Sequence, residues 1–192
     1  VEPAGKYEAA KNATAVDCTG KTLLPGLYDI HQHSDAISVN FLDNRKILDP
    51  FDFLNKVCLW SMRMMRMGYT TMRCMGAQDR VGIRLRKVID GGVFNGPRMF
   101  ACGNAIAGTT KQVIGENPGY DGVDEWIKAA RTEIANDADF IKVYASGSVM
   151  ANFGEPGQMV VTREEIKAAV QAGNARGAYA AAHAHSAESI QA

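Results

Sequence analysis

The sequence has no excess of charge, because its 21 basic residues are matched by 21 acidic ones. A chain without net charge has no long-range attraction for nucleic acid or an anionic membrane, so we expect neither as a partner. It also lacks an apolar run near the roughly 20 residues that span a bilayer. The opening stretch, VEPAGKYEAAKN, does not have the form of a signal peptide. Cytoplasm is therefore the expected compartment.

Several short enzyme motifs are absent as well. The sequence contains no Walker P-loop, no G-x-G-x-x-G and no G-x-S-x-G motif. The four cysteines include no C-x-x-C pair. Cys74 and Cys102 lie in apolar runs typical of strands, where a small buried thiol is the usual explanation. We expect inert thiols rather than disulfides or metal ligands.

Strand-like and helix-like segments alternate along the chain. The predicted strands occupy residues 21–33 (after a turn at Pro25-Gly26), 69–74, 97–102, 139–145 and 178–184. The predicted helices occupy residues 50–67, 80–90, 122–135 and 162–176, with one more beginning after residue 185. Pro50, Asp124 and the Thr162–Glu165 capping box mark helix starts, and Gly68 marks an end. This alternation is typical of βαβ units and a parallel sheet.

Two architectures accommodate such units. One is a complete doubly wound sheet with five strands. The other is part of an eight-stranded barrel, which normally needs about 250 residues. Residues 103–121 and 146–161 are long irregular segments after predicted strands, which is where either fold places its chemistry.

The histidines are the strongest local signal. The chain has four, and they form two H-x-H pairs at predicted strand ends: His31 with His33, and His183 with His185. Residues two apart in a strand point to the same face, so each pair can present both imidazoles together. Neutral imidazoles are common metal ligands. A single H-x-H pair can arise by chance, but two such pairs using every histidine favour a metal site.

Lys142 is the second unusual residue. It lies within the apolar segment Phe-Ile-Lys-Val-Tyr, on the same strand face as Phe140 and Tyr144. A buried ammonium without a partner is costly, so this lysine should be neutralised, paired or chemically modified. The alternative is an edge-strand lysine whose amine extends to water.

Three segments resemble the amidohydrolase superfamily, in its dipeptidase-like and imidazolonepropionase-like branch. Leu-Leu-Pro-Gly-Leu-Tyr-Asp-Ile-His-Gln-His is similar to its strand-one signature, Phe-Ile-Lys-Val-Tyr-Ala-Ser-Gly-Ser-Val to its strand-four segment, and Ala-Ala-His-Ala-His-Ser-Ala-Glu-Ser-Ile to its strand-five segment. The resemblance implies an α/β fold of the (β/α)8 TIM-barrel type. Residues 22–192 would form its first five βα units, and residues 1–21 the tail of a preceding small β-sandwich.

The resemblance also implies a set of site residues. His31, His33, Lys142 and His183 would bind two divalent metal ions, with zinc the first choice and Lys142 carbamylated by carbon dioxide to bridge both. Lys142 and His183 would be the catalytic residues. His185 and Tyr144 would contact the substrate.

The function implied is hydrolysis of an amide C–N bond by metal-activated hydroxide, in a dipeptidase- or carboxypeptidase-like enzyme. A cyclic-amide hydrolase of the imidazolonepropionase type is an alternative, although its single-metal site does not need a bridging carbamate. A catalytically incomplete metal-binding barrel fragment is another, and a doubly wound module with one histidine metal site is a third. The superfamily's strand-six His and strand-eight Asp do not occur in the sequence. We therefore expect strands six to eight on another segment or chain, and an unstable open barrel without them. The expected substrate is a small amide or dipeptide. Homo-oligomerisation is left open.

Overall fold

The computed structural model describes residues 12–38, 49–110, 118–149 and 155–192. Its strands are β1 (Leu27–Gln32), β2 (Tyr69–Cys74), β3 (Arg98–Ala101), β4 (Ile141–Tyr144) and β5 (Ala180–His183). Its helices are α2 (Pro50–Arg66), η1 (Gln78–Arg80), α3 (Val81–Asp90), α4 (Val123–Ala135), α5 (Arg163–Asn174) and α6 (Ala187–Ile190). The predicted alternation of strand and helix is confirmed.

Every strand pairing is parallel, and the strand order follows the chain. One sheet has the order β1-β2-β3, and a second pairs β4 with β5. The chain just after β3 joins the two sheets, because Ile106 N donates to Lys142 O at 2.8 Å and Tyr144 N donates to Ile106 O at 2.9 Å. A doubly wound sheet reverses its strand order part-way across, whereas a barrel keeps it sequential. The order therefore favours the barrel.

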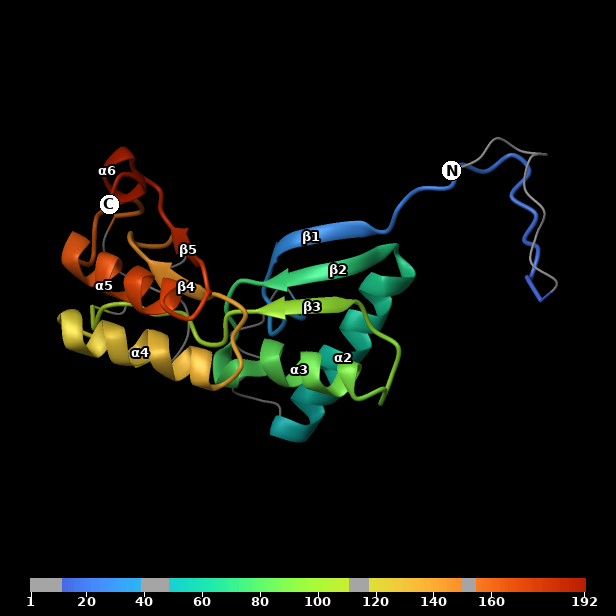
Figure 1. The fold of residues 1–192 in the computed structure, drawn as a ribbon, viewed down its shortest axis with the longest axis horizontal. Coiled ribbons are helices and arrows are strands. Elements are labelled where there is room, and N and C mark those ends of the chain that lie inside the picture. Colours follow the sequence, from blue (N-terminus) through green and yellow to red (C-terminus); the bar gives the residue numbers. More distant parts are fainter. Residues whose placement is uncertain (1–11, 39–48, 111–117, 150–154) are drawn as a thin grey trace.

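The helices cover one face of the strands, as Figure 1 shows for α2 and α3 beneath β1, β2 and β3. The apolar cluster between them includes Val57 from α2, Leu85 from α3 and Met72 from β2. Fully burying an aliphatic side chain of this size contributes about 1.5–3 kcal/mol. The helix-facing side of this sheet is thus the core, which leaves the opposite face for the interior of the barrel.

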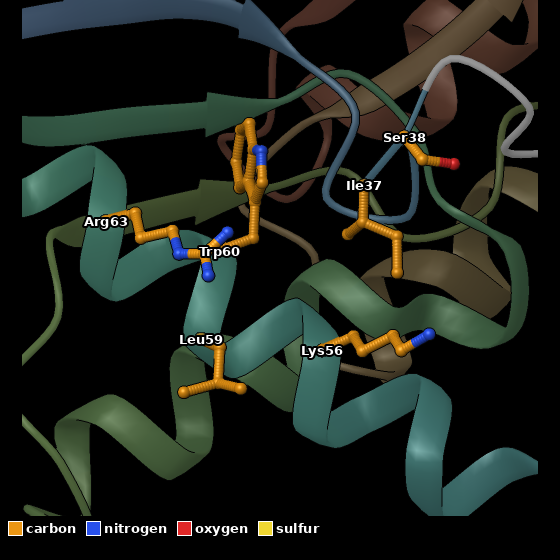
Figure 2. A pocket seen from close by; sticks show the side chains of 6 residues that line it. All are labelled: Ile37, Ser38, Lys56, Leu59, Trp60 and Arg63. Atoms are coloured by element: carbon orange, nitrogen blue, oxygen red, sulfur yellow. The ribbon is translucent and has the colours of Figure 1, made fainter.

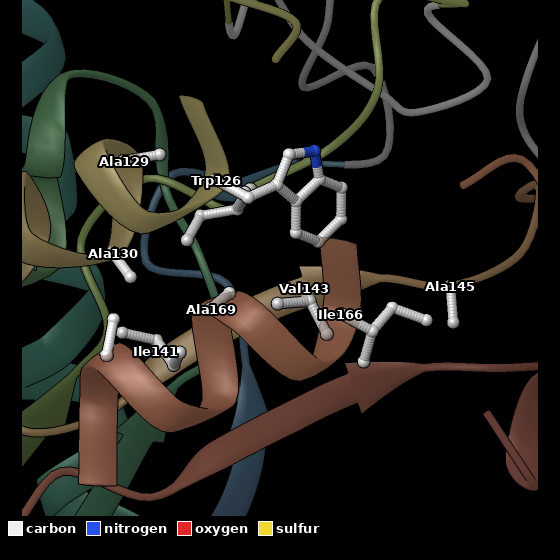
Figure 3. Packing of buried hydrophobic residues seen from close by; sticks show 10 residues of the cluster. Trp126, Ala129, Ala130, Ile141, Val143, Ala145, Ile166 and Ala169 are labelled. Atoms are coloured by element: carbon white, nitrogen blue, oxygen red, sulfur yellow. The ribbon is translucent and has the colours of Figure 1, made fainter. Parts of the chain in front are cut away.

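The second half repeats this arrangement. Trp126 of α4 and Ile166 of α5 pack against Ile141 and Val143 of β4 (Figure 3). Trp126 is fully buried, and its indole Nε1 donates to Tyr120 O at 2.9 Å. Because Ile141 and Val143 face the helices, the alternate residues of β4 face the interior of the barrel.

Aromatic and cationic side chains fill that interior below the strand ends. The Phe140 and Tyr179 rings are stacked, with centroids 5.0 Å apart. The Arg73 guanidinium lies 5.6 Å from the Phe140 ring centroid. Arg73 Nε donates to Ile30 O at 2.7 Å, so one side chain of β2 contacts both β1 and the aromatic pair. The two sheets are therefore tied across their inner faces.

Most predicted helix boundaries are confirmed. Pro50 stands at the start of α2, Gly68 follows its end with φ of 99°, and Thr162 and Glu165 form the capping box of α5. The prediction that Asp124 caps α4 is wrong. The N-cap is Gly122, with φ of 81° and no side-chain hydrogen bond, because the chain enters this helix through a turn that glycine adopts readily.

The segments outside the barrel elements add three facts. Of the predicted sandwich remnant at residues 1–21, residues 1–11 lie outside the described part and residues 12–21 contain no helix or strand. No helix in the described ranges has the length and apolarity needed to cross a membrane. All four cysteines are free thiols; Cys74 and Cys102 are buried as predicted, whereas Cys18 is exposed.

Candidate metal centre

The first imidazole pair lies at the carboxyl end of β1. The rings of His31 and His33 have centroids 5.5 Å apart. His33 Nδ1 lies 2.7 Å from the carbonyl oxygen of Gly76, which follows β2. A carbonyl can only accept, so Nδ1 carries the proton, and in the neutral ring Nε2 then keeps its lone pair. Hydrogen bonds of this kind fix the tautomer of metal-binding histidines.

Lys142 lies in the middle of β4, on the inner face together with Phe140 and Tyr144, and its side chain is only 1% exposed. Its Nζ has no hydrogen-bond partner among the described residues, and lies 5.6 Å from the centroid of the Tyr144 ring. The pKa of the Lys142 amine is lowered to about 8, mainly by burial; Cys102 opposes this shift, and the positive charge of Arg73 contributes to it. Its burial rules out the alternative of an edge-strand lysine whose amine extends to water.

The second imidazole pair follows on β5. The His183 ring lies 4.9 Å from the Tyr144 ring and 4.4 Å from the His185 ring, centroid to centroid. His183 Nε2 is buried without a partner in the described part of the chain. Burial lowers the pKa of His183 to about 4, helped by the charges of His185 and Lys142 and opposed by a hydrogen bond to the backbone of Gly147. This imidazole is therefore neutral near pH 7, as a metal ligand must be.

These groups lie close enough to influence one another's charge. The charge of Lys142 lowers the pKa of both His31 and His183, and His31 also acts on His183. Burial is the largest cause of the lowered His31 pKa. Three strands therefore bring their polar side chains to one end of the barrel interior, where folds of this type place their sites.

The donor set is incomplete for a metal ion. Within the described ranges, no three His, Cys, Asp or Glu side chains are grouped so that they could hold one. A protonated lysine has no lone pair to offer. Lys142 Nζ and His183 Nε2 are nevertheless among the buried side-chain atoms without a hydrogen-bond partner in the described part of the chain, as groups that bind a ligand often are.

Sequence reasoning missed one polar cluster near this site. Arg80, which follows β2, forms an ion pair with the buried Glu133 of α4, with Nη2 2.7 Å from Oε1. A signal was available, because Glu133 continues the helical spacing of the buried residues Trp126, Ala129 and Ala130. A carboxylate in the apolar stripe of an amphipathic helix requires a partner.

A separate pocket of about 310 Å³ lies between α2 and the segment that follows β1 (Figure 2). Its lining consists of Ile37, Ser38, Lys56, Leu59, Trp60 and Arg63. None of the histidines and neither Lys142 nor Tyr144 lines it. It is therefore distinct from the candidate metal centre.

Comparison with known proteins gives consistent matches. The family model described as "Amidohydrolase family" matches residues 22–192. An ochratoxinase of Aspergillus niger is 27% identical over 197 residues, covering 88% of this chain and 40% of the relative. A crystal structure of an amidohydrolase is 31% identical with a TM-score of 0.84, covering 96% of this chain and 49% of that one. The crystal structure of a prolidase complexed with N-methylphosphonate-L-proline is 27% identical with a TM-score of 0.82, and the match covers 96% of this chain and 49% of the prolidase chain.

These matches bear on the architecture. The chain spans about 40% of the length of the curated relative and about half of each of the two solved chains. A series of parallel strands in sequential order that matches half of a TIM-barrel chain is part of such a barrel. The predicted partial (β/α)8 fold is thus confirmed.

Proposed function

This chain belongs to the amidohydrolase family, and from that premise we propose that it supplies the first ligands of the metal centre of a hydrolase that cleaves amide C–N bonds. The observation that carries the proposal is the pair of buried, unpartnered atoms on neighbouring strands, Lys142 Nζ on β4 and His183 Nε2 on β5. Orphaned buried polar atoms are costly and rare, so they favour a bound group that would satisfy them.

The proposed centre holds two divalent ions, with zinc as the first choice for nitrogen and oxygen ligands, and the described residues would supply part of its ligand set. His31, His33 and His183 would contribute imidazole nitrogens, and Lys142 would contribute oxygens after carbamylation. When bound, such ions lower the pKa of water and polarise the scissile carbonyl. The remaining chemistry depends on what these side chains do.

Lys142 is suited to carbamylation because its pKa lies near 8, which leaves a useful fraction of neutral amine near neutral pH. The neutral amine would attack carbon dioxide: the N–C bond forms while one C=O π bond breaks and its electron pair moves to oxygen, and the nitrogen loses one proton to solvent. The product is an anion, with oxygen donors in place of a cationic ammonium. This step converts a costly buried cation into a group that attracts cations.

Tyr144 and His185 are proposed as substrate contacts. Both rings lie next to the His183 imidazole. His185 is exposed and can be reached from solvent, whereas Tyr144 is largely buried on the same face as Lys142. A phenol hydroxyl and an imidazole can each bind a polar group of a small substrate.

Dipeptide-like substrates are proposed because of the relatives. The prolidase structure was determined with N-methylphosphonate-L-proline, in which a tetrahedral phosphonate replaces the acyl group on the proline nitrogen. A tetrahedral centre at that position resembles a peptide carbonyl under attack by water. A small amide substrate with a free carboxylate is the corresponding proposal for this protein.

Metal content and dipeptide hydrolysis test the proposal in the purified protein with barrel strands six to eight present. We expect about two zinc ions per chain and hydrolysis of dipeptides, with Lys142→Ala abolishing activity and short-chain carboxylic acids partly restoring it. Lys128→Ala, at an exposed lysine of α4, is the control and should retain activity. Full activity in Lys142→Ala would contradict the carbamate model. Metal binding without activity would favour the incomplete-barrel alternative, and activity on cyclic amides with one ion would favour the imidazolonepropionase-like one.

A further inference from the structure

The loop after β2 has an unusual backbone. Asp79 and Arg80 both adopt left-handed conformations, with φ of 54° and 55°. A left-handed residue other than glycine costs about 1–2 kcal/mol, so two in succession need compensating contacts. Neither residue is a glycine, and the loop contacts the candidate ligand His33 through the Gly76 carbonyl. What holds this loop in place therefore bears on the site.

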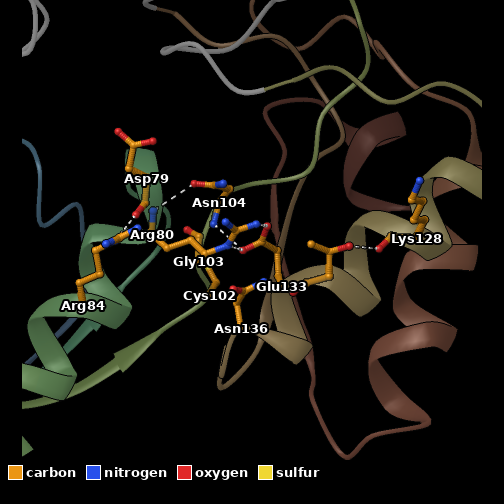
Figure 4. Close-up of polar contacts among 10 residues, drawn as sticks. Asp79, Arg80, Arg84, Cys102, Gly103, Asn104, Lys128, Glu133 and Asn136 are labelled. Atoms are coloured by element: carbon orange, nitrogen blue, oxygen red, sulfur yellow. Dashed lines mark hydrogen bonds and ion pairs between the residues drawn. The ribbon is translucent and has the colours of Figure 1, made fainter.

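The compensating contact is a paired ion interaction (Figure 4). Arg80 Nε donates to Glu133 Oε2 at 2.8 Å, and Nη2 donates to Oε1 at 2.7 Å. Two parallel bonds of this kind fix the geometry as well as the charge balance. Glu133 is 2% exposed, and its carboxylate raises the pKa of Arg80.

The same carboxylate fastens a second loop. The backbone nitrogen of Asn104, after β3, donates to Glu133 Oε2 at 3.1 Å, and Arg80 N donates to Asn104 Oδ1 at 3.3 Å. Gly103 lies so close that a Cβ there would be 2.2 Å from Glu133 Oε2. Glu133 therefore connects α4 to the loops that follow two different strands.

The other end of the β2 loop contacts the candidate ligands. The carbonyl of Gly76 accepts from His33 Nδ1. Gln78 N donates to Asp35 Oδ2 at 2.8 Å, two residues beyond His33. Ala77 N donates to Gly103 O at 3.3 Å. Between His33 and Glu133 there is thus a short, continuous set of backbone contacts running from Gly76 to Arg80.

We propose that the Arg80–Glu133 ion pair is a positioning device for the metal centre, which holds the Gly76 carbonyl where it selects the His33 tautomer with a free Nε2. The ligand role of His33 rests on the proposed function. The tautomer itself is a property of the metal-free protein. Arg80 and Glu133 are positioning residues, since they act through Gly76 and do not touch the reacting atoms.

A purely structural role predicts something different. Buried ion pairs often add little net stability, but removing one partner is strongly destabilising because the other charge is left unpaired. A structural role would therefore lower the melting temperature and leave the His33 imidazole unchanged. The discriminating measurement must report on that ring.

The experiment uses Glu133→Gln, Arg80→Lys and the control Glu165→Gln. Glu165 is also a buried helix carboxylate, but it accepts from Gly122 and Thr162, away from the β2 loop. Long-range nitrogen–proton NMR on the metal-free proteins at about pH 8 reads the tautomer of each histidine. We expect one Nδ1–H tautomer for His33 in the parent and in Glu165→Gln, and a mixture in Glu133→Gln and Arg80→Lys.

Zinc affinity is the second readout. Loss of a hydrogen-bond partner of a metal ligand typically lowers metal affinity 10–100-fold. We therefore expect about a tenfold decrease in zinc affinity in Glu133→Gln and in Arg80→Lys. Arg80→Lys keeps the charge but cannot form two parallel bonds, which gives a milder variant should Glu133→Gln not fold. An unchanged His33 tautomer in the folded variants, with only a lower melting temperature, would overturn the proposal. If the parent protein binds no zinc, the proposed function fails. The tautomer measurement still decides whether the Arg80–Glu133 ion pair positions the His33 ring.

Discussion

Lys142 lies directly beside Ala181 in the parallel ladder of β4 and β5. Neighbouring residues in such a ladder project to the same face, so the small alanine side chain leaves space next to the buried amine. Ala181 also packs against the inner-face cluster of Met75, Cys102 and Phe140. The alanine-rich sequence of β5 thus has a steric role at the candidate metal centre.

Filling that space is the first prediction. Ala181→Leu should destabilise the protein by about 1–3 kcal/mol through overpacking, and should reduce zinc binding by displacing the Lys142 side chain. Ala182→Leu, at the neighbouring exposed position, should change the free energy of unfolding by less than about 0.5 kcal/mol. Denaturant unfolding and zinc titration measure both effects. Equal effects of the two substitutions would contradict the steric role.

His183, at the end of β5, and His185, two residues later, should have different functions. Zinc at about 100 times its Kd should stabilise the parent protein by about 2.7 kcal/mol. His183→Asn should lose most of this stabilisation, because its buried Nε2 is a proposed ligand. His185→Asn should keep it and weaken substrate binding instead. Thermal unfolding with and without zinc tests the split, and the reverse ranking would exchange the assigned roles.

Gly103 should tolerate no side chain. Its φ is 76°, and a Cβ would lie 2.2 Å from Glu133 Oε2. Gly92 has a similar φ of 72°, but a Cβ there would have nothing within 4 Å. Gly92→Ala should therefore cost only the left-handed backbone strain, about 1–2 kcal/mol, and Gly103→Ala should cost clearly more. If urea unfolding gave similar losses of unfolding free energy for Gly92→Ala and Gly103→Ala, the loop that contains Gly103 would be able to move away from the Glu133 carboxylate.

Alkaline pH should weaken the fold through a buried thiol. Burial raises the pKa of the Cys74 thiol above its ordinary value, so the folded state keeps its proton at a pH where the unfolded chain has lost it. The folded state then binds more protons, and stability falls as pH rises above about 9, by at most about 1.4 kcal/mol per pH unit for one thiol. Cys74→Ala should reduce this slope in urea unfolding between about pH 8 and 10.5, while Cys18→Ala, at an exposed thiol, should leave it unchanged. A slope unaffected by Cys74→Ala would assign the alkaline loss to other groups.

The sequence predicted the elements and the inner-face residues of the candidate site well. Strand periodicity alone places Lys142 on the face opposite Ile141 and Val143, and the structure confirms this division. Both histidine pairs lie at strand ends, as predicted. These features are local, because the alternation of side chains within one strand needs no knowledge of the rest of the fold.

What escaped prediction depends on contacts between distant segments. Arg80 was placed at the start of a helix, but its left-handed backbone is held by Glu133, 53 residues further on. The acceptor for His33 is a backbone carbonyl, which leaves no trace in residue types. Asp124 has the composition of a cap, yet the tertiary path of the chain gives that position to Gly122. The metal ligation, the substrate contacts, the sandwich remnant and the cytoplasmic location stay predictions.

The placement of the two tryptophans gives each half of the protein its own optical reporter. Trp60 lies on α2 beside the first sheet, and Trp126 is fully buried on α4 beside the second. Because the chain has only these two, replacing either by phenylalanine leaves a single emitter in a known half. Coincident fluorescence transitions in the two variants would indicate that the sheets unfold as one cooperative unit, and separate transitions would indicate two.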